Sequence, residues 1–322
     1  MSASNKDLTS KINNLSITSD SDKLVTKDGR LSQKSYDKEA LKQRLQILGR
    51  NPEQNILNVI RQACTDTLSR DDFGKTLQSI KANFVQRDYE GIFTAEARNL
   101  QVYSAAYVPG RALCYFEIFC QSQLLKLLAR RTCIYAIGSG SGSELVSFAA
   151  AMTRVPAERQ RIKLIMQDIG EWAKVLETFE SASRQSWKLT EEQFSCQYLQ
   201  GDILDPTKRD ERAQRIADAD LITFMFVMNE LFVKKAAAME MVQSLVTNMK
   251  KGAHLLVVES AGSFSHLKVG NKTYMVHMLL DAIKDLQSVI SDDARWYRHP
   301  DNVRYPLDVQ NMRYFIRLYK KI

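Results

Sequence analysis

The chain is 322 residues long, with 44% hydrophobic residues, 25% charged residues and a formal net charge of +8. This length accommodates one large domain with an appendage, and the composition is ordinary for a soluble globular protein. No apolar run reaches the roughly 18–20 residues that a membrane-spanning helix needs, and the N-terminus lacks the apolar core of a secretory signal. We therefore expect an intracellular protein without a membrane segment.

The positive charge is concentrated at the two ends of the sequence. Residues 1–50 contain 10 Lys and Arg against 6 Asp and Glu, and residues 295–322 contain 7 against 2. Basic ends favour attraction to polyanions such as RNA. A solvated basic surface that serves only solubility is the alternative on charge alone.

Cysteine and histidine positions give no metal-ligand pattern. The five cysteines form no C-x-x-C pair and most lie in apolar surroundings, which is typical of reduced thiols in a core. The four histidines are scattered without ligand spacing. We expect no structural metal.

The first third of the chain is predicted to be a tail followed by helices. Residues 1–38 are rich in Ser, Asn, Asp, Thr and Lys and are expected to form a disordered basic tail. Apolar residues then recur at helical spacing, which predicts a helical region over residues 39–130. Within it, residues 107–110 (YVPG) read as a turn before a long helix over 111–128. Arg111 at the start of that helix could face a carboxylate or phosphate, or be a surface charge.

A short glycine-rich stretch, residues 132–144 (TCIYAIGSGSGSE), opens the predicted sheet domain over residues 131–322. The apolar run 133–137 predicts a buried parallel strand, and the apolar residues after Glu144 predict a helix. Between them lie the interleaved small residues Gly138, Ser139, Gly140 and Gly142. A strand, a tight turn and a helix N-terminus let backbone N–H groups approach a ligand closely.

The glycine spacing separates two classes of ligand. A dinucleotide site has G-x-G-x-x-G, but here the spacing is G-x-G-x-G and no glycine stands at Ser143. The observed spacing is similar to the first motif of class I S-adenosylmethionine methyltransferases, in which the loop cradles the methionine end of the cofactor. An ordinary Gly/Ser turn is the alternative.

Two acidic residues follow later strands at positions suited to a nucleoside. The strand predicted over 161–169 ends near Asp168, where doubly wound folds bind ribose hydroxyls. Asp168 could instead cap the next helix. Residues 194–199 predict a third strand, and Asp202 and Ile203 follow it. A carboxylate just past a strand end can accept a hydrogen bond from an adenine amino group.

Polar residues also follow the most apolar run of the chain. Residues 221–228 predict a fully buried strand, and Asn229 and Glu230 come directly after it, where open α/β sheets have their ligand crevice. A helix over 236–249 and strands over 254–259 and 313–319 complete the pattern. Because strands and helices alternate five times, we predict a doubly wound, mostly parallel α/β sheet.

Six segments together resemble the fungal 25S ribosomal RNA (uridine-N3) methyltransferase family, over about residues 105–320. They are residues 167–172 (QDIGEW), 226–232 (FVMNELF), 259–263 (ESAGS), 295–298 (RWYR), 305–307 (YPL) and 310–314 (QNMRY). The resemblance implies a seven-stranded Rossmann-like methyltransferase sheet, S-adenosyl-L-methionine as cofactor, and ribosomal RNA or a pre-ribosomal particle as partner. It also implies a monomer that acts in the nucleus or nucleolus, in the cytoplasm, or in both.

The same resemblance implies roles for individual residues. The residues expected to bind the cofactor are Gly138, Ser139, Gly140, Gly142, Glu144, Asp168, Asp202, Ile203 and Asn229. Asn229 is expected to orient uracil, and Glu230 or Glu259 to take its N3 proton, although Glu230 could simply begin a helix. The residues expected to bind the RNA substrate are Arg111, Trp296, Arg298 and Arg304, with packing against a sheet edge as the alternative for Trp296.

One departure from the methyltransferase pattern keeps other functions open. Ala136 stands where many class I enzymes have an acidic residue that holds the cofactor's amino group, so Glu144 or a backbone carbonyl must substitute. One alternative is an RNA-binding ribosome-assembly protein with a degenerate cofactor site. The other is a small-molecule methyltransferase or aminopropyl transferase on a similar sheet.

Overall fold

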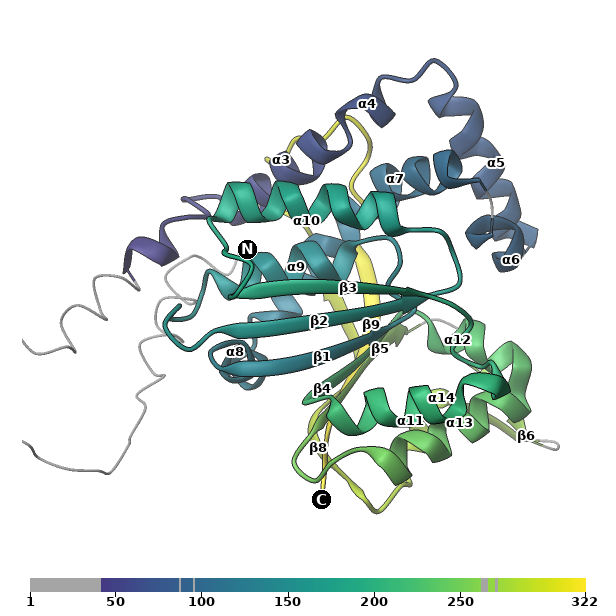
Figure 1. The fold of residues 1–322 in the computed structure, drawn as a ribbon. Coiled ribbons are helices and arrows are strands. Elements are labelled where there is room, and N and C mark those ends of the chain that lie inside the picture. The colour runs from purple at the N-terminus through teal and green to yellow at the C-terminus, as the bar shows by residue number, and fades with distance from the viewer. Residues whose placement is uncertain (1–41, 87, 95, 262–265, 270–271) are drawn as a thin grey trace, which may run out of the picture.

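The computed structural model describes residues 42–86, 88–94, 96–261, 266–269 and 272–322, so the predicted tail over 1–38 lies outside it. Its centre is a seven-stranded sheet with the order β3-β2-β1-β4-β5-β9-β8 (Figure 1). β1 to β5 are parallel, and β9 lies antiparallel between β5 and β8. The predicted doubly wound, mostly parallel sheet is therefore confirmed. The strands are β1 (Arg131–Ile137), β2 (Arg161–Asp168), β3 (Phe194–Gln200), β4 (Leu221–Met225), β5 (His254–Ser260), β8 (Leu286–Tyr297) and β9 (Met312–Lys321).

Helices cover both faces of the sheet. One face carries the N-terminal helices together with α9 and α10, and the other carries α11, α13 and α14 (Figure 1). A separate hairpin is formed by β6 (His266–Val269) and β7 (Lys272–Met275). The helices are α3 (Pro52–Ala63), α4 (Thr65–Leu68), α5 (Phe73–Gln86), α6 (Tyr89–Phe93), α7 (Ala97–Phe119), α8 (Ser122–Leu128), α9 (Ser143–Met152), α10 (Ala173–Trp187), α11 (Arg209–Asp218), α12 (Met228–Leu231), α13 (Lys235–Asn248) and α14 (Val276–Asp281).

The side chains of β1 divide the core into two layers. Ile134 and Ala136 join the buried cluster that includes α3, α7, α9 and α10, whereas Tyr135 and Ile137 join the cluster beneath the other face. This alternation follows from the period of two in a strand. The N-terminal helices thus share one core with the sheet, and treating residues 39–130 as a separate region stays a prediction.

Helix α7 contradicts the predicted turn at residues 107–110. It runs without a break from Ala97 to Phe119, with Pro109 inside it. A proline in a helix removes the bond to the carbonyl four residues earlier, here that of Ala105. The hydroxyl of Tyr305 donates to that carbonyl at 2.8 Å, so the buried acceptor keeps a partner. Next to it, a side chain at Gly110 would lie 2.7 Å from the backbone oxygen of Gln310.

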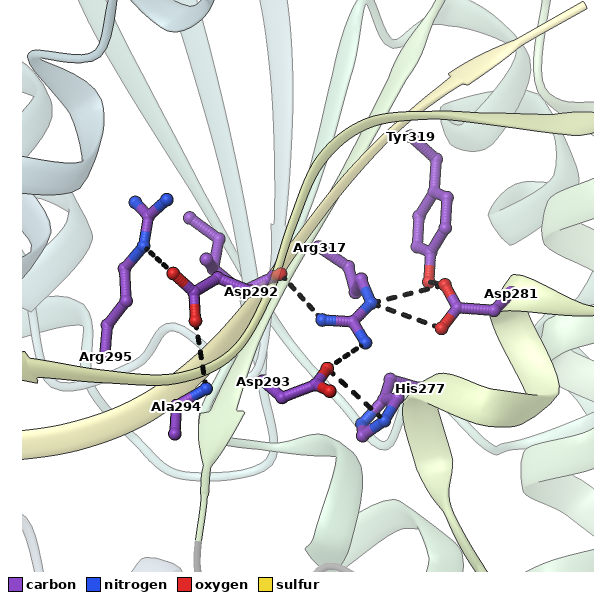
Figure 2. Close-up of polar contacts among 9 residues, drawn as sticks. His277, Asp281, Asp292, Asp293, Ala294, Arg295, Arg317 and Tyr319 are labelled. Atoms are coloured by element: carbon purple, nitrogen blue, oxygen red, sulfur yellow. Dashed lines mark hydrogen bonds and ion pairs between the residues drawn. The ribbon is translucent and has the colours of Figure 1, made fainter.

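A buried arginine of β9 connects β8, the last strand at one edge of the sheet, to α14. The guanidinium of Arg317, which is 3% exposed, donates to the carboxylates of Asp281 and Asp293 (Figure 2). The Tyr319 hydroxyl donates to Asp281 at 2.7 Å, and His277 lies beside Asp293. Since a buried charge needs partners, these contacts fix the edge of the sheet against α14.

Strand ends differ from the expected ones in one place that matters for the site. The strand predicted over 221–228 ends at Met225, because Phe226 takes a φ of +61°. The N–H of Phe226 donates to the carbonyl of Val258. Val227 follows, and α12 begins at Met228. No helix in the described part of the chain is long and apolar enough to span a membrane.

Candidate active site

A cavity of about 810 Å³ opens at the carboxyl ends of the parallel strands. One wall comes from the loops after β1 to β4, and the other from α6, the residues before it and α7. Ligands of open α/β sheets bind at this edge. Its size is that of a site for a small molecule or cofactor.

The glycine loop forms the turn that was predicted. Gly138 has a φ of +70° and Gly142, the residue before α9, has a φ of +94°. A side chain at Gly138 would lie 2.4 Å from Val227, and one at Gly142 would lie 2.6 Å from Phe179. Both positions therefore require glycine for conformation and for space. Gly138 and Ser141 line the cavity.

The indole of Trp172 lies against the middle of this loop. A side chain at Gly140 would come within 2.0 Å of the indole, so this glycine makes room for tryptophan. Trp172 is fully buried and contacts Phe93 and Tyr103, with ring centroids 6.3 Å and 5.6 Å away. The N-terminal helices thus contact the glycine loop through this indole and through Ser104 of α7, whose hydroxyl donates to the Ser141 carbonyl at 3.1 Å.

Asp168 at the end of β2 ties the loop to that indole. Its Oδ2 accepts from the N–H of Gly140 at 3.0 Å. Its Oδ1 accepts from the N–H of Gly170 at 3.1 Å and from the Trp172 indole at 2.9 Å. Asp168 also lines the cavity, so its carboxylate is within reach of a ligand there. Burial raises the pKa of Asp168, and these hydrogen bonds, together with one from the backbone of Ile169, act against that rise.

Asp202 and Ile203 line the same cavity beyond β3. The Asp202 carboxylate accepts from the Leu204 N–H at 2.8 Å and forms an ion pair with Lys234 at 3.2 Å. A carboxylate beside an apolar side chain at this rim matches the place expected for an adenine.

Two predicted cofactor ligands lie beneath the loop and do not line the cavity. The Ser139 hydroxyl donates to the Ala136 carbonyl at 3.2 Å. Glu144 is 2% exposed and accepts a hydrogen bond from Thr223 of β4 at 2.5 Å. Burial raises the pKa of Glu144 to about 8, and the Thr223 bond opposes that rise. Their role at a cofactor stays a prediction.

Three polar residues, two from α12 and one from β5, lie close together at the carboxyl edge of the sheet. Asn229 and Glu230 line the cavity. Glu259 at the end of β5 accepts from the backbone N–H groups of Asn229, at 3.2 Å, and of Ser260, at 2.8 Å. Burial raises the pKa of Glu259 to about 7 and that of Glu230 to about 8. The positive charge of Arg111 opposes the rise at Glu230.

Arg111 reaches this point from the opposite wall. It stands at successive spacings of four from Tyr107 and Tyr103, so all three share one face of α7. Its guanidinium donates to the Tyr103 hydroxyl at 2.6 Å and lies 5.4 Å and 5.7 Å from the ring centres of Tyr103 and Tyr107. Arg111 is therefore a positioned cation in the cavity wall rather than a surface charge.

The remaining predicted substrate residues lie outside the cavity. Trp296 ends β8 at the same carboxyl edge and is 58% exposed, with Arg298 and Arg313 stacked at 5.7 Å and 5.9 Å from its ring centre. Arg304 is exposed, and its backbone exchanges two hydrogen bonds with the Gln54 side chain of α3. The structure thus separates an enclosed site from an outer aromatic and basic surface.

Sequence reasoning missed Tyr103 and Trp172 as site residues. A signal for Tyr103 is present in the sequence, since Tyr103, Tyr107 and Arg111 recur every four residues. The turn predicted at 107–110 hides it, because a turn there would place Tyr103 and Arg111 on different helices. Trp172 follows Asp168 by four residues within the segment 167–172, and nothing in that segment indicates that the indole contacts the glycine loop. Among the described residues, no group of three or more potential metal ligands is clustered.

The fold and the cavity define a doubly wound α/β protein with a small-molecule or cofactor site at the carboxyl edge of its sheet. A family model described as "Putative SAM-dependent methyltransferase" matches residues 60–320. Because this match spans most of the chain, the protein belongs to that family of S-adenosylmethionine-dependent methyltransferases.

Individual proteins resemble the chain to different degrees. The 25S rRNA (uridine(2843)-N(3))-methyltransferase of Saccharomyces cerevisiae is 29% identical over 283 residues, which cover 76% of this chain and 77% of its own length. An O-methyltransferase family protein from Burkholderia thailandensis is 14% identical, with a TM-score of 0.46 over 83% of this chain and 71% of its own. The N-methyltransferase NodS from Bradyrhizobium japonicum, in complex with S-adenosyl-L-homocysteine, is 14% identical. Its TM-score is 0.40, over 70% of this chain and 97% of its own.

The residues of the cavity fit S-adenosylmethionine. Asp168 presents a carboxylate suited to a ribose hydroxyl, Asp202 and Ile203 suit the adenine, and Gly138 lines the cavity beside them. The cofactor supplies an electrophilic methyl group on a positively charged sulfur. Since the Asn229–Glu230 pair lies at the same cavity, an acceptor atom could be presented there.

Proposed function

We propose that this protein methylates N3 of a uridine in large-subunit ribosomal RNA. The observation that carries the proposal is that Asn229 and Glu230, from α12 after β4, and Arg111, from the facing wall of α7, line one cavity together with the glycine loop. The name of the yeast relative, a 25S rRNA uridine-N3 methyltransferase, supports the same substrate. This RNA would be met inside the cell, in the nucleolus, the nucleus or the cytoplasm.

The chemical problem at N3 explains why a buried carboxylate is needed. N3 of uracil carries a proton and is a poor nucleophile until that proton leaves. In the proposal, Asn229 holds the uracil edge and Glu230 accepts the N3 proton. The electron pair left on N3 then forms the new N–C bond to the methyl group, and S-adenosylhomocysteine remains. Because N3 lies on the pairing edge, the base must be unpaired or flipped out.

The environment of Glu230 suits a general base. A base works best when its pKa lies near the working pH, and burial raises that of Glu230 to about 8. Proton acceptance requires the ionised form, so the rate of the chemical step should increase as the pH rises towards 8.

The outer surface around Trp296 supports an RNA substrate. Aromatic rings stack on unpaired bases, and arginines meet phosphates. Trp296 lies two strands away from the end of β5, a lateral distance of about 10 Å. An RNA strand whose flipped base enters the cavity could therefore contact this surface with its neighbouring nucleotides.

The decisive experiment is single-turnover methylation with a Glu230→Gln variant. We expect it to retain affinity for RNA and for S-adenosylhomocysteine, yet to react roughly 10²–10⁴-fold more slowly at pH 7 because the proton acceptor is lost. The loss should shrink as the pH rises, since uracil then ionises unaided. Mass spectrometry of digested RNA would identify N3-methyluridine.

Glu191→Gln is the matched control, because Glu191 is an exposed glutamate outside the cavity lining and should not affect the rate. A normal rate for Glu230→Gln would assign the proton to Glu259 or to water. Calorimetry with S-adenosylmethionine distinguishes the remaining alternative: a chain that binds RNA but not the cofactor would be an assembly protein with a degenerate site.

A further inference from the structure

The space between Arg111 and Glu230 suits a ligand with a hydrogen-bond acceptor for the guanidinium and, next to it, a hydrogen-bond donor for the carboxylate. Both side chains line the cavity, from α7 and from α12. Each influences the ionisation of the other, yet they do not form an ion pair within 4.0 Å. Opposite charges that share a cavity without touching leave room for a group between them.

Most of the hydrogen-bonding capacity of Arg111 is not used by the described residues. A guanidinium has five N–H donors. The hydroxyl of Tyr103 is the one described group that accepts from it, and the rings of Tyr103 and Tyr107 hold its plane. Tyr103 is 2% exposed and is itself fixed by contacts with Phe93 and Trp172, so the arginine has a rigid support.

The edge of uracil complements this arrangement. Its N3–H donor lies between two carbonyl acceptors, and all three project from the same edge of the ring. A base with N3–H directed at Glu230 therefore places a carbonyl oxygen beside that contact, where the guanidinium of Arg111 can donate to it. Cytosine would instead present an unprotonated N3 to the carboxylate and, at the C4 position, an amino group to the guanidinium. Both of those contacts are repulsive.

We propose that Arg111 binds the uracil carbonyl oxygen next to N3 and stabilises the negative charge that this oxygen gains when the N3 proton leaves, with Tyr103 as the residue that positions the guanidinium. This inference rests on the proposed uridine-N3 activity and adds the group that selects uracil and makes its N3 acidic. When Glu230 takes the proton, the electron pair of the N–H bond stays on the base and is shared with the carbonyl oxygens. A fixed cation at one of them stabilises the anion before it attacks the methyl group.

The test compares uridine with 5-fluorouridine in the RNA fragment that the wild-type enzyme methylates. Fluorine at C5 makes N3 more acidic, so the reaction then depends less on help from the protein. We expect Arg111→Met to slow single-turnover methylation of uridine by about 10²–10³-fold, the range measured for removal of one charge-stabilising donor. With 5-fluorouridine the loss should fall to about tenfold or less, while affinity for S-adenosylhomocysteine stays unchanged.

Two further variants keep the result interpretable. Tyr103→Phe removes only the hydroxyl that accepts from Arg111, and we expect a smaller loss with the same rescue by 5-fluorouridine. It also serves if Arg111→Met does not fold. Arg154→Met is the control, because Arg154 likewise stacks on an aromatic ring, that of Phe116, but does not line the cavity. It should show wild-type rates with both RNAs.

The outcomes separate the two proposals. If wild-type enzyme forms no N3-methyluridine on any ribosomal RNA, the proposed function fails, and the role of Arg111 fails with it. If the wild type is active but Arg111→Met loses the same factor on uridine and 5-fluorouridine, Arg111 is a structural residue and only this inference is overturned. An unchanged rate for Arg111→Met overturns it as well.

Discussion

Three glutamates at the carboxyl edge of the sheet have pKa values near neutrality, and their surroundings give them different tasks. Glu230 faces the cavity, Glu259 is held by two backbone N–H groups, and Glu144 lies under the glycine loop against Thr223. Burial is the largest cause of the raised pKa in each case. A raised pKa therefore does not by itself identify the general base. Glu230 is the candidate because it is the one of these three glutamates that lines the cavity.

Glu144 allows this distinction to be tested through stability. The pKa of Glu144 is about 8 in the folded state, whereas the ordinary value of 4.5 applies in the unfolded state. Between these two pH values the folded state therefore holds a proton that the unfolded state has lost. Its contribution to the unfolding free energy therefore falls as the pH rises from about 4.5 to about 8. Glu144→Gln removes this dependence, so relative to the wild type it should gain on the order of 2 kcal/mol between pH 4 and pH 8.5.

Urea unfolding over that pH range measures the difference. We also expect Glu144→Gln to bind S-adenosylhomocysteine with nearly wild-type affinity, because the carboxylate does not line the cavity. Parallel stability curves would mean that Glu144 titrates normally. A large loss of affinity would restore the interpretation that it holds the cofactor's amino group.

At the scale of elements, α7 is the helix on which the site depends, and its continuity comes from the distant residue Tyr305. Pro109 leaves the carbonyl of Ala105 without a helical donor, and the Tyr305 hydroxyl supplies one. Tyr305→Phe should therefore lower the unfolding free energy by about 1–2 kcal/mol, the cost of one unpaired buried carbonyl. Equilibrium urea unfolding would measure it.

Tyr107→Phe is the matched control, since the Tyr107 hydroxyl has no hydrogen-bond partner among the described residues. It should unfold like the wild type. If Tyr305→Phe is equally stable, water or a local widening of the helix must satisfy the Ala105 carbonyl instead.

The same helix shows where sequence-based prediction succeeds and where it ends. The parallel strands, the glycine turn and the positions of Asp168, Asn229 and Glu230 follow from patterns within a few residues, and they were predicted. The continuity of α7 was not, because the group that compensates for Pro109 lies 200 residues away. The place of Glu144 likewise depends on Thr223, and β8 escaped notice because two register shifts and its exposure at the sheet edge obscure the alternation.

At the scale of the whole molecule, the enclosed site and the outer basic surface should affect different measurements. Arg298→Ala and Arg313→Ala remove the two cations that flank Trp296. Each should weaken RNA binding and lower the slope of log affinity against log salt by about one, because each phosphate contact releases counterions. Affinity for S-adenosylhomocysteine should not change.

Lys251→Ala is the control for charge alone, since Lys251 is exposed just before β5, at the opposite edge of the sheet. It should leave the salt slope almost intact. If all three variants share one slope, the attraction to RNA arises from the overall charge rather than from the Trp296 surface.

The position of β9 also determines the order in which the protein can be assembled during synthesis. β9 follows β8 in the chain but lies between β5 and β8, so β8 has no strand to pair with until β9 has been translated. β1 to β5 and their helices can associate earlier, while the edge of β5 stays open. Open strand edges are sites of wrong pairing and aggregation. The nascent chain is therefore most vulnerable in the interval between the emergence of β5 and that of β9, and folding is completed by inserting a late strand into a gap in the sheet.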